Sequence, residues 1–224
     1  MAQTTTTTID AQMAAIDDAV NAAFEPLRGH PQADRAAAVV SNLADYGLIW
    51  VALAAVKARR RGPDRRRAVV ALATAGFSSL IVSRVVKAAV ERQRPDDHLA
   101  ATVRTPSSSS FPSGHTLAAF CTAFVLADTD TQTAANVGFA AAVAASRVHL
   151  KAHHPTDVIG GAAIGSVLGL GLRPLVNLVT PGSRQGRLPA RAGSRRGGGG
   201  RRAAKRRTRD ARGMDANGVV FEQL

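Results

Sequence analysis

Apolar residues fall into five stretches separated by polar segments, and each stretch predicts a helix. They run over about 36–56, 68–90, 113–128, 131–147 and 156–179. A helix that crosses a bilayer needs about 20 residues, so the third and fourth stretches are short. Pairing these two as a hairpin around residues 128–130 lets both belong to one bundle. The pattern predicts an all-α transmembrane helical bundle of about five spans over residues 36–179.

The region before the bundle has a different pattern. Residues 1–8 are rich in Thr and predict a disordered tail. Within residues 9–28 the apolar positions recur at spacings of three and four, namely Ile9, Met13, Ile16, Val20, Phe24 and Leu27. Acidic residues lie opposite this stripe, which predicts an amphipathic helix at the membrane interface or docked on the bundle. Asp45, inside the first stretch, is expected to face the bundle interior or a polar cavity, because ionisable groups rarely face lipid.

Basic residues are concentrated in two segments and give the chain a formal net charge of +13. Seven Lys and Arg lie in 57–67, and eleven Arg and one Lys lie in 184–212. With aromatics at only 4%, this is not typical of a soluble nucleic-acid-binding domain. The positive-inside rule places both segments in the cytoplasm. Residues 181–224 predict a disordered basic Gly/Arg-rich tail, which we expect to bind anionic lipids. RNA binding is the alternative, and no specific nucleic-acid partner is expected.

Three clusters carry candidate chemistry, and the first is Lys87 with Arg94. These residues are seven apart, about two helical turns, so they share a helix face that should end near Arg94 because Pro95 follows. Two cations at a helix end suit a phosphate dianion, although such residues also anchor spans at the interface.

The second cluster is Pro112-Ser113-Gly114-His115, where a loop enters the third helix. The free backbone N–H groups of Ser113 and Gly114 predict an anion site at the helix N-terminus, within reach of His115.

The third cluster contains Arg147, at the end of the fourth helix, and His153 with Asp157 at the start of the fifth. Pro155 predicts that the fifth helix begins at about 154–155. Asp157 in its first turn can hold one imidazole nitrogen and leave the other free to attack. His149, His153 and His154 could suggest a metal, but no HExxH motif or carboxylate triad accompanies them and the surrounding Arg and Lys would repel a cation. Neither a metal nor a cofactor is therefore expected. In the order of the helices, all three clusters fall on one membrane face and both basic segments on the other.

Together the clusters resemble the phosphatidic acid phosphatase type 2 superfamily, which includes lipid phosphate phosphatases and vanadium haloperoxidases. The family has three motifs in order. The first, K-x6-R-P, is met at Lys87, Arg94 and Pro95, and the second, P-S-G-H, is met at 112–115. The third, S-R-x5-H-x3-D, is met at Ser146, Arg147, His153 and Asp157. The resemblance covers about 68–179.

The resemblance implies a metal-independent, two-step hydrolysis. His153 attacks phosphorus and Asp157 orients it, while His115 protonates the leaving alkoxide and then activates water. The groups implied to hold the phosphoryl oxygens are Lys87, Arg94, Ser113, Gly114 and Arg147.

The expected substrate is a lipid phosphate in the bilayer: a polyprenyl diphosphate, a prenyl-phosphate sugar phosphate, phosphatidate or phosphatidylglycerophosphate. A vanadium haloperoxidase-like oxidase and a catalytically silent lipid-phosphate binder are the alternatives. The Ala-, Arg- and Gly-rich composition is typical of a high-GC bacterium. We therefore expect a multi-pass protein of the inner (plasma) membrane, with an extracytoplasmic active site and a cytoplasmic tail. The oligomeric state stays open.

Overall fold

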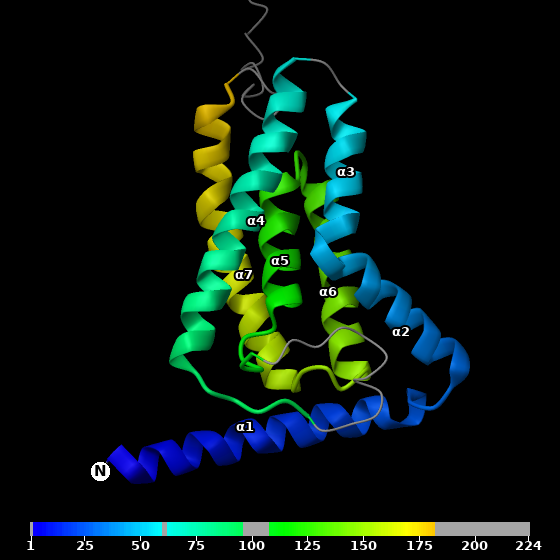
Figure 1. Cartoon of the computed structure of the whole chain (residues 1–224), viewed down its shortest axis with the longest axis vertical. Coiled ribbons are helices and arrows are strands. Elements are labelled where there is room, and N and C mark those ends of the chain that lie inside the picture. The colour runs from blue at the N-terminus through cyan, green and yellow to red at the C-terminus, as the bar shows by residue number, and fades with distance from the viewer. Residues whose placement is uncertain (1, 60–61, 96–107, 182–224) are drawn as a thin grey trace, which may run out of the picture. The chain divides into compact units, whose positions relative to one another are not determined.

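The computed structural model describes residues 2–59, 62–95 and 108–181, whose regular elements are all helices (Figure 1). The predicted all-α class is therefore confirmed. The long helices are α1 Ala2–Phe24, α2 Pro31–Ala44, α3 Leu48–Ala58, α4 Pro63–Ala89, α5 Gly114–Leu126, α6 Asp130–His149 and α7 Pro155–Val179, with 3-10 turns at Glu25–Leu27 and Asp45–Gly47.

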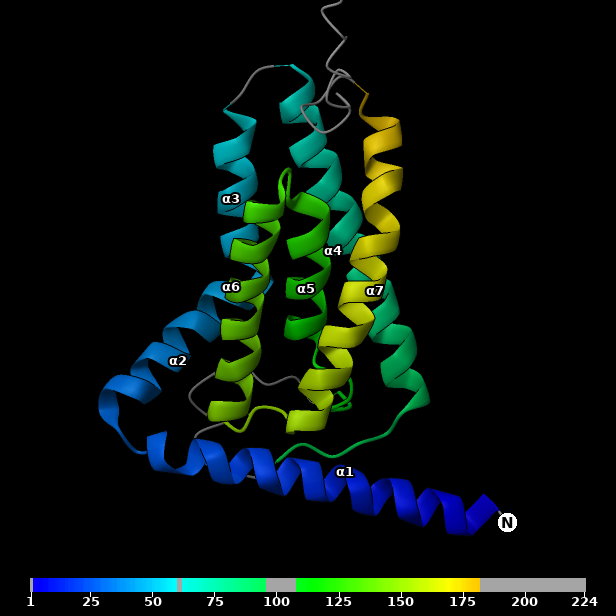
Figure 2. The same ribbon diagram turned by 180° about the vertical axis from the view of Figure 1, so that it is seen from behind.

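Helix α5 lies at the centre of the bundle, chiefly against α7, with α4 and α6 on its other sides (Figures 1 and 2). The contact with α7 is close because α7 presents three glycines to it. A Cβ at Gly161 would lie 2.7 Å from the carbonyl oxygen of Ser113, and one at Gly169 would lie 2.7 Å from that of Cys121. Gly165 meets the Leu117 backbone in the same way. This small-residue face lets the two backbones approach, which brings the N-terminal ends of α5 and α7 together.

Helices α4 and α7 are each long and apolar enough to cross a membrane. Helices α2 and α3 make a third span only if taken as one bent pair, and α5 is a shorter apolar helix. The count of five spans stays a prediction. The prediction of one continuous helix over 36–56 was wrong, because α2 and α3 meet at a bend of 59°. Gly47 lies in this break with a φ of +67°, a conformation that favours glycine.

Helix α1 begins at Ala2, so the residues predicted to be a disordered tail are helical from position 2. It runs across the ends of α6 and α7 (Figures 1 and 2). Asp17, from the polar face, is buried, whereas Ile9 and Ile16 are 51% and 45% exposed. The helix therefore docks through polar contacts, and its place at the membrane interface stays a prediction. The basic tail lies outside the described residues, as do residues 60–61 of the basic loop.

A polar cluster joins the helix ends farthest from α1. Asp128, in the turn between α5 and α6, accepts hydrogen bonds from Lys57 at 2.5 Å and Arg67 at 2.9 Å. Arg67 is 2% exposed and also donates to the carbonyl of Val125 at 3.0 Å. These contacts hold the ends of α3 and α4 against the end of α5. Two basic residues of the 57–67 segment thus have intramolecular partners.

Candidate active site

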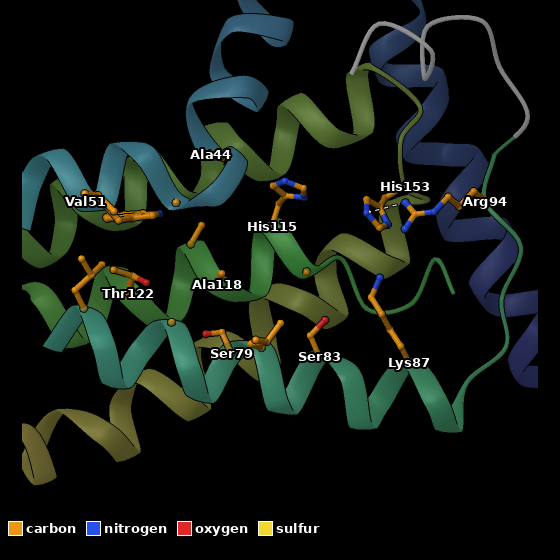
Figure 3. A pocket seen from close by; sticks show the side chains of 17 residues that line it. Ala44, Val51, Ser79, Ser83, Lys87, Arg94, His115, Ala118, Thr122 and His153 are labelled. Atoms are coloured by element: carbon orange, nitrogen blue, oxygen red, sulfur yellow. Dashed lines mark hydrogen bonds between the residues drawn. The ribbon is translucent and has the colours of Figure 1, made fainter. Parts of the chain in front are cut away.

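A cavity of about 540 Å³ lies between α3, α4 and α5 (Figure 3). Its polar end is lined by five of the predicted site residues, namely Lys87, Arg94, Gly114, His115 and His153. Its other end is mainly apolar, with Trp50, Val51, Leu72 and Leu80 among the lining residues. Residues from three separate sequence clusters therefore meet at one end of an apolar cavity. The remaining three, Ser113, Arg147 and Asp157, are fully buried around it.

Arg94 does not share a helix face with Lys87, contrary to the expectation from their spacing. Helix α4 ends at Ala89, and Val90 is already extended at φ −127° and ψ 105°. The chain beyond it pairs with the segment before α5, because the N–H of Ser110 donates to the carbonyl of Arg92 at 2.8 Å. Tertiary pairing thus ends the helix before Pro95 could, and Arg94 enters the site from an extended segment.

The hydrogen bonds of His153 determine its tautomer. Its Nδ1 lies 2.9 Å from the Ser110 carbonyl oxygen, which can only accept, so Nδ1 carries the proton. An Arg94 N–H donates to Nε2 at 3.1 Å, so Nε2 keeps its lone pair (Figure 3). Nε2 is therefore the nitrogen with nucleophilic character.

Asp157 does not hold the imidazole directly, as the spacing of four had suggested. Its Oδ2 lies 3.7 Å from Nδ1 of His153, beyond hydrogen-bond distance. Oδ2 accepts instead from the hydroxyl of Ser110 and from the N–H of His154 at 2.9 Å. Ser110 thus joins the two, since its hydroxyl binds the carboxylate while its carbonyl binds the ring. The sequence showed Ser110 only as part of a Ser-rich loop and offered no signal for this role.

His153 is 2% exposed. This burial lowers its pKa to about 4, and the charges of Arg94 and Arg147 act in the same direction while Asp157 opposes them. The ring is therefore neutral at pH 7, the state that a nucleophile requires.

Three guanidinium N–H groups near His153 are buried without a partner among the described residues. They are on Nη2 of Arg94 and on both Nε and Nη2 of Arg147. The remaining nitrogen of Arg147, Nη1, donates to the hydroxyl of Ser41 at 2.6 Å and fixes the side chain. A buried donor with no acceptor is costly, and charged donors of this kind suit phosphate oxygens. The arrangement fits a site that is completed by an anion.

Ser113 is not free to bind an anion through its backbone, contrary to the prediction. Its N–H donates to the carbonyl of Asp157 at 3.0 Å, and its hydroxyl accepts from Thr116 at 3.0 Å. The close contact of α5 with α7 thus occupies the amide that the sequence left open. Gly114 does line the cavity, and the first amides of α5 have no partner within the helix.

His115 is paired with Asp45, a partner 70 residues away in sequence. Its Nε2 lies 2.6 Å from Oδ1 of Asp45, which sits in the break between α2 and α3. Asp45 therefore faces the polar end of the cavity, in agreement with its expected orientation. The pair leaves Nδ1 of His115 outside this hydrogen bond. The ionisable residue in an apolar stretch was the only sequence signal, and it did not name the partner.

The comparisons with known proteins agree with this arrangement. Residues 67–180 match the family model of the PAP2 superfamily. The chain belongs to the PAP2 superfamily.

Similar proteins include two decaprenylphosphoryl-5-phosphoribose phosphatases. The one from Mycolicibacterium smegmatis is 36% identical over 147 residues, 65% of this chain and 81% of that protein. The one from Mycobacterium tuberculosis is 32% identical over 131 residues, 58% of this chain and 73% of that protein. A PAP2-type phosphatidylglycerolphosphate phosphatase structure from Bacillus subtilis superposes with a TM-score of 0.61 and 24% identity, covering 74% of this chain and 87% of that one. The predicted family is confirmed, and the last comparison supports the fold.

Beyond the PAP2 motifs, sequence reasoning missed an acidic and basic network behind Asp157. Arg92 donates to Oδ1 of Asp157 at 2.6 Å and to Oδ2 of Asp17, on α1, at 2.6 Å. Burial alone lowers the pKa of Arg92, but the hydrogen bonds and charges of these two carboxylates outweigh it and raise the pKa above its usual value. Arg92 therefore stays charged and balances the carboxylate of Asp157. A lone Arg in a polar loop carried no signal for this role.

Proposed function

We propose that this PAP2 protein is an integral-membrane lipid phosphate phosphatase that works through a phosphohistidine on His153. The observation that carries the proposal is the surroundings of Nε2. A neutral nitrogen lies next to buried guanidinium N–H groups without acceptors, at the end of an apolar cavity. A phosphate ester entering this end would place its phosphorus near Nε2 and its oxygens near Arg94 and Arg147.

In the first step, Nε2 of His153 attacks phosphorus, and the bond from phosphorus to the lipid oxygen breaks. His115 donates a proton to the leaving oxygen, which departs as the hydroxyl of the dephosphorylated lipid or of its sugar, or as the lipid monophosphate when the substrate is a diphosphate. Lys87, Arg94 and Arg147 stabilise the negative charge on the phosphoryl oxygens.

In the second step, water attacks the phosphohistidine. His115, now deprotonated, accepts a proton from the water, and the bond between Nε2 and phosphorus breaks. The products are inorganic phosphate and free enzyme, so no co-reactant other than water is needed.

The cavity supports a substrate with an apolar chain. Beyond the two histidines its walls are formed by residues such as Trp50, Leu72 and Leu80, which suit a hydrocarbon and not a soluble phosphate. Among the four expected lipid classes we place the prenyl-phosphate sugar phosphates first, because the two named relatives are decaprenylphosphoryl-5-phosphoribose phosphatases.

The test is phosphate release from the four lipid classes in detergent, comparing the wild-type protein with His153→Ala. We expect the highest kcat/KM on a prenyl-phosphate sugar phosphate, complete loss of turnover in the variant, and loss of its labelling by phosphate. Substantial turnover by His153→Ala would refute the nucleophile assignment. Bromide oxidation dependent on added vanadate, without phosphatase activity, would support the haloperoxidase alternative.

We further propose that the active site is extracytoplasmic. The ends of α3 and α4 that carry the basic segment lie with Asp128 at the α5–α6 turn, whereas the catalytic residues gather at the starts of α5 and α7. The positive-inside rule then orients the bundle. Alkaline phosphatase fused after residue 62 should be inactive, and fused after residue 104 it should be active. The reverse result would invert the orientation.

A further inference from the structure

The loop between α6 and α7 carries His153, and both helix ends that flank it are capped by side chains from the N-terminal segment. Helix α6 ends at His149 and α7 begins at Pro155. The capping residues, Asp17 on α1 and Arg28 after it, lie outside the part of the chain that matches the PAP2 family. Figures 1 and 2 show α1 running across these helix ends.

Asp17 caps the start of α7. It is 5% exposed, and its Oδ1 accepts the backbone N–H of Thr156 at 2.7 Å. Its Oδ2 accepts from the Thr156 hydroxyl at 3.0 Å and from Arg92 at 2.6 Å. The first N–H groups of a helix lack partners within it, and a negative charge there is favourable. Because Arg92 also binds Asp157, Asp17 fixes two groups that border the catalytic carboxylate.

Arg28 caps the end of α6. Its side chain is 5% exposed, and it donates to the carbonyls of Val148 and His149, both at 3.1 Å. Asn21, on α1, holds the same guanidinium through its side-chain oxygen at 2.8 Å. The last carbonyls of a helix lack partners within it, and a positive charge there is favourable. Each helix end next to the catalytic loop therefore meets the charge that complements it.

We propose that the N-terminal segment is a brace for the catalytic loop, in which Asp17 and Arg28 are positioning residues for the phosphatase reaction. Neither residue touches the cavity. Both act by holding the backbone ends between which His153 is placed, and Asp17 acts also through Arg92 on Asp157. This inference rests on the proposed function for its kinetic consequence, while the contacts themselves can be tested without activity.

The test compares two pairs of matched variants. Asp17→Asn is paired with Asp18→Asn, because Asp18 is the next residue on α1 but is exposed. Arg28→Gln is paired with Arg35→Gln, because Arg35 is exposed on α2. We expect kcat to fall about ten- to a hundredfold in Asp17→Asn and Arg28→Gln with KM changed less than about twofold, the scale of losing hydrogen bonds to a charged group. The two controls should stay within about twofold of wild type.

Two further measurements separate positioning from general loss of stability. In an Arg92→Gln background, adding Asp17→Asn should lower kcat by less than a further factor of about three, since the effects of substituting residues that act through one another are not additive. Hydrogen exchange of the amides in 150–158 should be faster in Asp17→Asn and unchanged in Asp18→Asn. If Asp17→Asn or Arg28→Gln does not fold, Arg28→Lys is measured instead. This variant keeps the charge but cannot bind both the Val148 and the His149 carbonyl, and it should lower kcat about threefold.

The outcomes distinguish this inference from the proposed function. An active wild type with equal kcat in Asp17→Asn and Asp18→Asn would overturn the brace and leave the phosphatase standing. Faster exchange in Asp17→Asn without a change in kcat would overturn it as a positioning device. A wild type that releases no phosphate from any lipid, with faster exchange only in the brace variants, would count against the proposed function and support the brace contacts.

Discussion

Replacing Asp45 by Asn tests whether the pair with His115 serves the leaving-group step. The substitution keeps the size of the side chain and removes its charge. In the structure the carboxylate accepts from Nε2 at 2.6 Å, a short hydrogen bond that fixes the ring and leaves Nδ1 for proton transfer. The His115 and Asp45 side chains are 21% and 17% exposed, so solvent does not replace the contact easily.

The expected loss follows from that contact. A hydrogen bond to a charged group contributes about 1.5–3 kcal/mol, and losing about 2 kcal/mol of transition-state stabilisation lowers kcat about thirtyfold. KM should change little, because in the proposed site Lys87, Arg94 and Arg147, not Asp45, hold the phosphoryl oxygens. Asp130→Asn is the control, since Asp130 is exposed at the start of α6 and does not line the cavity.

The assay compares two leaving groups. With a lipid phosphate the leaving alkoxide needs a proton, so Asp45→Asn should show the full loss. With p-nitrophenyl phosphate the leaving phenolate needs none, so the initial burst of phenolate should keep nearly its wild-type rate. Equal losses on both substrates, or a loss no greater than that of Asp130→Asn, would refute the assignment of Asp45 to proton transfer by His115.

Three other predictions address the nucleophile, the phosphate site and the absence of a metal. The unfolded chain should bind more protons than the folded one between about pH 6.5 and pH 4, because burial holds the pKa of His153 at about 4. The free energy of unfolding should therefore fall by up to about 3 kcal/mol as the pH is lowered through this window, and His153 should not affect it at higher pH. Denaturation measured in detergent should show this pH dependence in the wild type and not in His153→Asn. Arg147→Lys should lower kcat/KM about a hundredfold, since one ammonium cannot replace the donors on both Nε and Nη2. Arg35→Lys should behave as wild type, and an equal effect in both variants would contradict the phosphate role of Arg147. Phosphate release should survive EDTA, and loss of activity that Mg²⁺ or Zn²⁺ restores would show that the reaction uses a metal.

The sequence determined the helical class, the family and the residues that gather at the cavity. Helix class follows from apolar periodicity, which is local. The start of α7 at Pro155 was also predicted correctly, because proline constrains its own φ and is favoured in a first helical turn. Lys87, His115 and His153 were recognised because the family motifs have fixed internal spacing, although no spacing between motifs shows how their side chains meet.

Only the tertiary structure decided how each of these residues is held. The early end of α4 depends on backbone pairing between residues 92 and 110, which no helix propensity contains. Ser110, not Asp157, is the direct partner of His153, and this depends on where the loop places the carbonyl and the hydroxyl of Ser110. Asp17 pairs with Arg92 and Asp45 pairs with His115 from segments far away in sequence, and local sequence cannot encode such partners. The physical reason is that hydrogen bonds and burial act between groups that are close in space, and those distances exist only once the helices have packed.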